Sequence, residues 1–151
     1  MALEVPLFTA QHEAAHVVVG VALGLKLREA LIGLSWNEGA QIYGYTWFPA
    51  GTVRDREALA CMYAAGPAYE RLLGRPPAQI ELQCSVDFQR LRELRVGVRG
   101  VETFIRAASA LLESRSTVHA RVTRALLEHT KIRGVDVEAL ARGERISIRD
   151  E

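Results

Sequence analysis

The chain has 151 residues, 49% of them hydrophobic and 25% charged, a composition that excludes an intrinsically disordered protein. Its formal net charge at pH 7 is only +1, which gives no electrostatic reason to expect a nucleic-acid partner. This length suits one domain with a buried core, and no repeat or low-complexity linker divides residues 1–151.

The longest apolar stretch near the N-terminus covers residues 14–25. It is shorter than a bilayer-spanning helix and lacks the basic flank and cleavage site of a signal peptide. The two cysteines, Cys61 and Cys84, form no CxxC pair and indicate no disulfide framework. We therefore expect a cytoplasmic protein with no membrane partner, in which both cysteines are free thiols.

The first predicted element is a helix over residues 6–24, which Gly24 ends. This helix is apolar almost all round, so we expect it to be buried at the centre of the fold. Two strands follow, over residues 29–34 and 41–48, and the second is rich in aromatic and β-branched side chains. Residues 37–39 predict the turn between them.

The rest of the chain predicts helices, over residues 54–73, 86–96, 101–112, 116–130 and 135–142. Pro76 and Pro77 predict a loop after the first of these helices. Ser85 is a good N-cap for the second, and Gly97 and Gly100 break the chain before the third. The predicted fold class is α+β and mainly helical, with a small sheet in the N-terminal half and a C-terminal helical bundle.

One segment of the first helix carries metal-site chemistry: His12-Glu13-Ala14-Ala15-His16. Residues four apart on a helix are about 6 Å apart along the axis and about 40° apart around it, so His12 and His16 share a face. Their rings can both reach one tetrahedral Zn²⁺. Glu13 is then placed to act as the general base that takes a proton from the attacking water and passes it to the leaving amine.

The residues themselves leave the third zinc ligand open. A catalytic zinc keeps three protein ligands and one open position. The acidic candidates lie downstream, at Glu57, Glu70, Glu81 and Asp87. Glu70 has two further interpretations, either as a carboxylate that holds a ligand imidazole or as a helix acid paired with Arg71 or Arg75.

Three other residues with ligand chemistry are assigned ordinary roles. His119 and His129 are ten residues apart and have no metal spacing, so we expect both at the surface or at an interface. Cys84 is expected to be a small buried thiol.

Four segments in order resemble the FtsH-type zinc peptidases, the proteolytic half of the membrane AAA+ proteases. Residues 9–16 resemble that family's active-site helix. Residues 65–74, 85–90 and 126–140 are similar to its Gly-Gly-Arg-Ala-Ala-Glu helix, its Asn-Asp-Leu-x-Arg-Ala stretch and its closing helical hairpin. The resemblance covers nearly the whole chain.

This resemblance implies a zinc metalloendopeptidase with a mainly helical, zincin-like fold. It implies His12 and His16 as zinc ligands, Asp87 as the third ligand and Glu13 as the base. It also implies that the strand over residues 41–48 is an edge along which an extended peptide lies, with substrate contacts from Ile42, Tyr43, Gly44 and Tyr45.

The sequence also departs from the family. Ala15 replaces the family's glycine, Pro67 replaces an arginine, and residues 83–86 differ from its approach to the third ligand. The chain has no Gly-x-x-x-x-Gly-Lys-Ser/Thr phosphate loop and no membrane helix. We therefore expect an ATP-independent endopeptidase that acts on unfolded or flexible polypeptide, with a separate unfoldase and a homo-oligomer open as partners.

The alternative function is a non-catalytic, zinc-stabilised module that binds peptides or assembles with other chains. Glu13 argues for the enzyme, because a purely structural zinc site has no use for a base. A structural site would instead close with a fourth protein ligand, for which Cys84 is the candidate.

Overall fold

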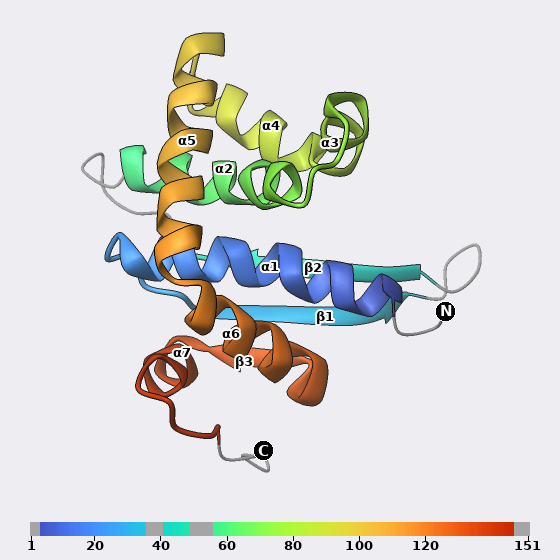
Figure 1. Cartoon of the computed structure of the whole chain (residues 1–151), viewed down its shortest axis with the longest axis vertical. Coiled ribbons are helices and arrows are strands. Elements are labelled where there is room, and N and C mark those ends of the chain that lie inside the picture. Colours follow the sequence, from blue (N-terminus) through green and yellow to red (C-terminus); the bar gives the residue numbers. More distant parts are fainter. Residues whose placement is uncertain (1–3, 36–40, 49–55, 147–151) are drawn as a thin grey trace.

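Seven helices and three strands make up residues 4–35, 41–48 and 56–146, the part of the chain that this computed structural model describes (Figure 1). In chain order they are α1 (Glu4–Ala22), β1 (Glu29–Ser35), β2 (Gln41–Trp47), α2 (Arg56–Leu72), α3 (Pro77–Gln83), α4 (Ser85–Glu93), α5 (Val98–Ser114), α6 (Ser116–His129), β3 (Lys131–Arg133) and α7 (Gly134–Ala141). The chain is mainly helical with a small sheet, as predicted. None of the described helices is long and apolar enough to cross a membrane.

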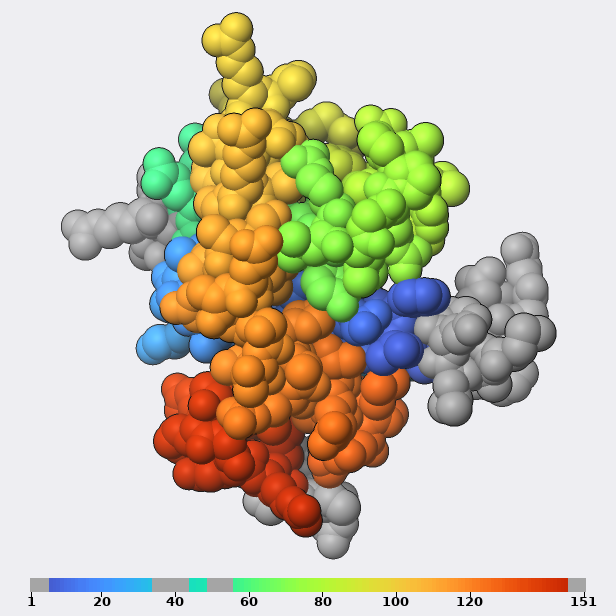
Figure 2. Space-filling view, in the orientation of Figure 1, coloured from blue at the N-terminus to red at the C-terminus, as the bar shows by residue number. Residues whose placement is uncertain are grey.

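Helix α1 is buried at the centre of the fold, as its apolar sequence predicts. Its small residues Ala14 and Ala15 are fully buried, and so is Ala65 of the facing helix α2, which lets the two helices pack closely. A Cβ atom at Gly20 would overlap the ring of Phe48, so the glycine leaves room for that ring. The space-filling view shows the N-terminal end of α1 emerging between the green and orange helices (Figure 2).

The three strands form one antiparallel sheet in the order β2-β1-β3. Strand β1 is central, with Ala30 opposite both Thr46 of β2 and Ile132 of β3. Strand β2 is therefore an edge strand, as the resemblance implies. The pattern of residues did not predict β3, because it has only three residues and only Ile132 among them is buried.

Several helix boundaries differ from the prediction. Pro76 and Pro77 do not form only a loop, because Pro76 is the N-cap of α3 and Pro77 its first residue, where a proline is favourable. Ser85 lies inside α4, whose N-cap is Cys84. Gly97 does precede a helix, but Gly100 lies within α5. The predicted turn at residues 37–39 lies outside the described residues, as do residues 54 and 55.

The C-terminal helices do not form a bundle of their own. Helix α5 packs mainly on α2, and α6 packs mainly on α1 (Figure 1). His119 of α6 is buried, contrary to a surface position: its Nε2 atom lies 2.9 Å from the Gln11 carbonyl oxygen, and its ring centroid is 4.6 Å from that of Tyr69. These contacts fix α6 against both α1 and α2.

Candidate metal centre

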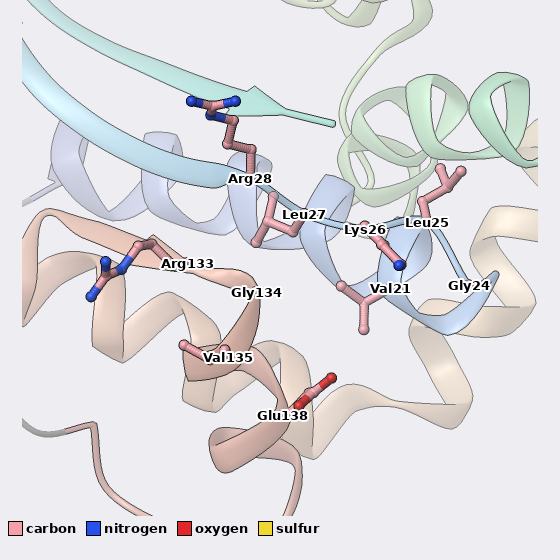
Figure 3. A pocket seen from close by; sticks show the side chains of 10 residues that line it. All are labelled: Val21, Gly24, Leu25, Lys26, Leu27, Arg28, Arg133, Gly134, Val135 and Glu138. Atoms are coloured by element: carbon pink, nitrogen blue, oxygen red, sulfur yellow. The ribbon is translucent and has the colours of Figure 1, made fainter. Parts of the chain in front are cut away.

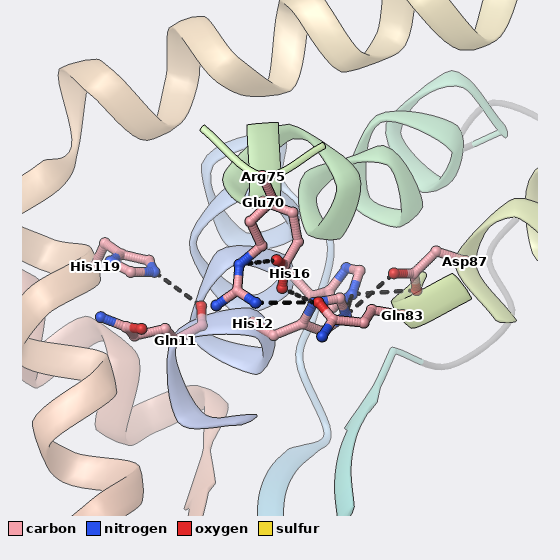
Figure 4. Close-up of polar contacts among 8 residues, drawn as sticks. All are labelled: Gln11, His12, His16, Glu70, Arg75, Gln83, Asp87 and His119. Atoms are coloured by element: carbon pink, nitrogen blue, oxygen red, sulfur yellow. Dashed lines mark hydrogen bonds and ion pairs between the residues drawn. The ribbon is translucent and has the colours of Figure 1, made fainter. Parts of the chain in front are cut away.

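Three side chains from distant parts of the sequence meet beside the middle of α1. His12 and His16 belong to α1, and Asp87 to the first turn of α4. His12 Nε2 lies 3.1 Å from Asp87 Oδ2, His16 Nε2 lies 3.2 Å from Asp87 Oδ1, and the two Nε2 atoms are 3.1 Å apart (Figure 4). Tetrahedral zinc with bonds of about 2.0–2.1 Å separates its ligand atoms by roughly 3.3 Å. Each of the three observed distances is close to that separation, and the two imidazoles contact different oxygens of the Asp87 carboxylate.

The outer nitrogen of each ring faces an acceptor, which determines where the ring carries its proton. His16 Nδ1 lies 2.7 Å from the Met62 carbonyl oxygen, so Nδ1 donates and Nε2 keeps its lone pair in the neutral ring. His12 Nδ1 faces Glu70 Oε1 at the longer ion-pair distance of 3.7 Å, which favours the same tautomer. Both Nε2 lone pairs therefore point toward the Asp87 carboxylate. Such a convergence of acceptors favours a cation between them, either a proton on an Nε2 atom or a metal ion.

The buried carboxylate of Asp87 also favours a bound cation. Asp87 is 9% exposed, and its Oδ2 atom makes no aligned hydrogen bond within the described part of the chain, although it lies close to His12. An unsatisfied buried carboxylate oxygen costs free energy. Two imidazole nitrogens and one carboxylate oxygen are a ligand set typical of zinc, so these residues fit the metal that the sequence predicts.

The electrostatics of this cluster favour positive charge. Burial lowers the pKa of His12, but Asp87 and Glu70 outweigh this effect and raise the pKa to about 10. Burial also lowers the pKa of His16, and the charge of Asp87 again produces a net rise. Burial raises the pKa of Asp87, but the two imidazoles hold it well below its usual range. The cluster therefore favours a bound cation, whether protons or a metal ion.

Glu13 lies on the side of the cluster that faces β2. Its side chain is buried, and its Oε2 atom accepts a 2.7 Å hydrogen bond from Thr46 Oγ1. A carboxylate oxygen of Glu13 lies within 4.8 Å of ring nitrogens of His12 and His16. A Cβ atom at Gly44 would come within 2.6 Å of Glu13 Cγ, so β2 approaches α1 this closely because that residue is glycine.

Gly66 plays a similar part on the side of α2. A Cβ atom at this position would overlap Asp87 Oδ2 and lie 2.6 Å from His12 Cε1. A sequence signal for this residue exists, because a glycine inside a helix costs about 1 kcal/mol relative to alanine and so indicates a packing reason. Met62 contributes only a main-chain carbonyl, which no side-chain pattern encodes.

A cleft of about 360 Å³ opens beside this cluster, with Glu13 and His16 in its lining. One wall is β2, from Gly44 onward, and the opposite wall comes from α2 and α4 through Tyr63 and Arg90. The large side chains Tyr45 and Trp47 of β2 are 43% and 39% exposed. The cleft therefore runs between the edge strand and the helices that hold the candidate ligands.

The free edge of β2 carries main-chain groups that can be identified from the register. The Ile32 N–H donates to the Thr130 carbonyl oxygen at 2.8 Å, on the β3 side of β1. Amide groups alternate between the two edges of a strand, so the odd-numbered residues of β1 bond to β2. Their register partners in β2 are Tyr43, Tyr45 and Trp47. The open edge thus presents N–H and C=O groups of Ile42, Gly44 and Thr46.

The structure brings some of the other predicted residues to this site and leaves some away from it. Glu70 stands behind His12, on the Nδ1 side, and not beside the Nε2 atoms. Glu57 and Glu81 are exposed and take no part in the cluster. The backbones of Ile42 and Tyr43 lie in β2, while their side chains are outside the described structure.

Cys84 is a free thiol with 1% exposure, as expected. Its sulfur lies within 4.8 Å of ligand atoms of His12 and Asp87. Burial and the nearby carboxylates of Asp87 and Glu70 raise the pKa of the Cys84 thiol. Cys84 is therefore close enough to compete for a soft metal ion but is held as a neutral thiol.

A second hollow, of about 620 Å³, lies between the start of β1 and the first turn of α7 (Figure 3). Lys26, Arg28 and Glu138 are among its lining residues. No residue of the metal cluster lines this hollow, and the Arg28 guanidinium packs over Trp47 at 4.7 Å from the ring centroid. It is not part of the candidate site.

No protein-family model matches the chain, and no curated protein matches it. We therefore infer the function from the chemistry and geometry of His12, Glu13, His16 and Asp87.

Proposed function

We propose that this chain is a zinc-dependent endopeptidase, related to the FtsH-type peptidase domains and zincin-like in its active-site helix. The observation that carries the proposal is the convergence of His12 and His16, whose Nε2 atoms are 3.1 Å apart, on the two oxygens of the Asp87 carboxylate at 3.1 and 3.2 Å. Glu13 beside them adds a group that a purely structural site does not need. The substrate class is unfolded or flexible polypeptide.

The metal and the protein have separate tasks in this proposal. A zinc ion held by His12, His16 and Asp87 would supply Lewis-acid chemistry, which lowers the pKa of a coordinated water to about 7. Glu13 takes the proton from the attacking water and gives it to the leaving amine. Thr46 holds one oxygen of Glu13, so the carboxylate is oriented before the substrate arrives. The Met62 carbonyl oxygen keeps His16 in the tautomer whose Nε2 is free.

The open edge of β2 supports binding of an extended peptide. A peptide strand can pair with the outward main-chain groups of Ile42, Gly44 and Thr46, as in other cases of strand addition. Gly44 and Thr46 also line the cleft next to Glu13. A peptide paired there would carry one of its carbonyl groups past the base.

A non-catalytic, zinc-stabilised module is the second candidate, and the position of Cys84 favours it. If its sulfur were a fourth ligand, all positions on zinc would be filled by protein and no place for water would remain. The two candidates therefore differ in the coordination of the metal and in the need for Glu13.

A single substitution separates them. We expect Glu13→Gln protein to fold, to bind one zinc ion per chain and to lose hydrolysis of a casein-like unfolded substrate, because only proton transfer is removed. Zinc content is measured by elemental analysis and cleavage by the appearance of peptides. His16→Ala should lose both the metal and the activity. Wild-type protein that binds zinc but leaves the substrate intact would favour the structural module.

A further inference from the structure

Arg75 follows α2 and reaches the carboxylate that stands behind His12 (Figure 4). Its Nε atom lies 2.5 Å from Glu70 Oε2, in an ion pair that is not aligned as a hydrogen bond. The other oxygen of Glu70, Oε1, faces His12 Nδ1 at 3.7 Å. The three side chains thus form a continuous row from Arg75 through Glu70 to the metal cluster.

Because the Glu70 carboxylate is buried, its position in this row of side chains depends on Arg75. Glu70 is 5% exposed, and a carboxylate at such a depth is costly unless a cation accompanies it. Among the described residues, Arg75 is the arginine or lysine that forms an ion pair with Glu70. Removing the guanidinium would leave the Glu70 carboxylate without this contact and free to turn away from His12.

Arg75 is itself held by three elements. Its guanidinium carbon lies 4.4 Å from the ring centroid of Phe8 in α1, and its Nη1 donates to Gln83 Oε1 of α3 at 3.3 Å. Gly74, with φ of 76°, turns the chain back at the end of α2, and the Arg75 N–H then donates to the Glu70 carbonyl oxygen at 3.2 Å. The arginine is therefore fixed on the same turn as the carboxylate that it pairs with.

We propose that Arg75 is a positioning residue of the metal centre. It holds the Glu70 carboxylate in its orientation toward His12, so that His12 Nδ1 faces Glu70 while His12 Nε2 faces His16 and Asp87. Carboxylates behind ligand histidines fix the ring orientation and raise its basicity, and their loss typically weakens metal binding roughly 10–100-fold. This inference rests on the proposed zinc site and adds a residue that no zinc-binding motif contains.

The test is the zinc dissociation constant of Arg75→Met, measured by competition with a chromophoric chelator. We expect binding to weaken roughly 10-fold or more, as for loss of Glu70 itself. Arg71→Met is the matched control: Arg71 is near the same end of α2, and it forms an exposed ion pair with Glu102 at 2.7 Å, away from the cluster. That variant should bind zinc as the wild type does.

A double-mutant cycle distinguishes positioning from a general effect on folding. In the background of Glu70→Gln, the Arg75→Met change should weaken zinc binding little further. Arg75 acts on the metal centre through the Glu70 carboxylate, which this background already lacks. Should Arg75→Met fail to fold, Arg75→Gln replaces it in the same cycle. Unchanged zinc affinity in these variants, or effects that add in the double variant, would overturn the role of Arg75. Wild-type protein that binds no zinc would instead overturn the proposed function, and this inference with it.

Discussion

Thr46 and Glu13 form a contact on which proton transfer depends in the proposed reaction. The hydroxyl of Thr46 donates to Glu13 Oε2 at 2.7 Å, and ring nitrogens of His12 and His16 lie within 4.8 Å of a carboxylate oxygen of Glu13. A hydrogen bond to a charged group contributes about 1.5–3 kcal/mol. Part of that free energy keeps Glu13 in the orientation that receives the proton.

We therefore expect Thr46→Val to lower kcat about 10-fold or more, equivalent to at least about 1.4 kcal/mol, with zinc content unchanged. Steady-state cleavage of an unfolded substrate and elemental analysis measure the two quantities. Thr103→Val is the control, because the Thr103 hydroxyl donates to the Arg99 carbonyl oxygen at 3.0 Å on an exposed part of α5. A Thr46→Val enzyme with the wild-type kcat would show that Glu13 needs no such support.

A second prediction at the residue scale concerns Gly66, where we expect alanine to lower the stability of the protein and not to raise it. Alanine normally stabilises a helix interior by about 1 kcal/mol relative to glycine. At Gly66 the added methyl group would overlap Asp87 and crowd His12, so Gly66→Ala should weaken zinc binding and lower the midpoint of thermal unfolding. Gly100→Ala in α5 should do neither, because its Cβ meets only a methyl group of Val96. Equal zinc affinity of the two variants would contradict this account.

At the scale of elements, helix α1 was predictable because the pattern that indicates it lies within one continuous segment of the sequence. The spacing of His12, Glu13 and His16 on one apolar helix follows from the sequence, and so does the burial of that helix. The sequence offered Asp87 as one of four acidic candidates, and only the resemblance to a family singled it out as the third ligand. No local pattern relates a residue in α4 to one in α1. The structure places the Asp87 carboxylate 3.1–3.2 Å from the Nε2 atoms of His12 and His16.

The elements that the sequence did not predict depend on contacts made after folding. Strand β3 has three residues, and its pairing with β1 follows the left-handed turn at Thr130, where φ is 62°. Helix α3 begins at a Pro-Pro pair that is equally typical of a loop. His119 is buried because α1 and α2 surround it, and the sequence of α6 alone contains no sign of those neighbours.

The register of β2 allows a prediction about the element as a whole. The N–H group of Ile42 faces the open edge, whereas that of Tyr43 faces β1. Proline removes an N–H group and is tolerated on edge strands where that group points outward. Ile42→Pro should therefore raise KM for an unfolded substrate while the zinc stays bound. Tyr43→Pro should instead break the pairing with β1 and lower stability, as followed by thermal unfolding. An unchanged KM for a folded Ile42→Pro protein would argue against strand addition at this edge.

At the scale of the whole molecule, strands and helices surround the segment of α1 that carries His12, Glu13 and His16. Sheet residues cover one side of α1, and α2, α5 and α6 cover the others, so the candidate ligands are held from several directions (Figure 1). In the described part of the chain, the cleft of about 360 Å³ gives access to Glu13 and His16. Its walls are a strand edge and two helices, which suits an extended chain better than a folded surface.

The final prediction follows from that access. Global unfolding of a typical domain costs about 5–15 kcal/mol, and strand pairing at one edge cannot supply this to a buried segment. The purified chain should therefore cleave an unfolded polypeptide with no nucleotide present and leave the same polypeptide intact when it is tightly folded. One substrate is digested in its native form and in a permanently unfolded form, with and without ATP, and the fragments are measured by mass spectrometry. Glu13→Gln protein purified in parallel accounts for any contaminating protease. Equal cleavage of both forms, or cleavage only with ATP, would contradict a peptidase that depends on substrate flexibility alone.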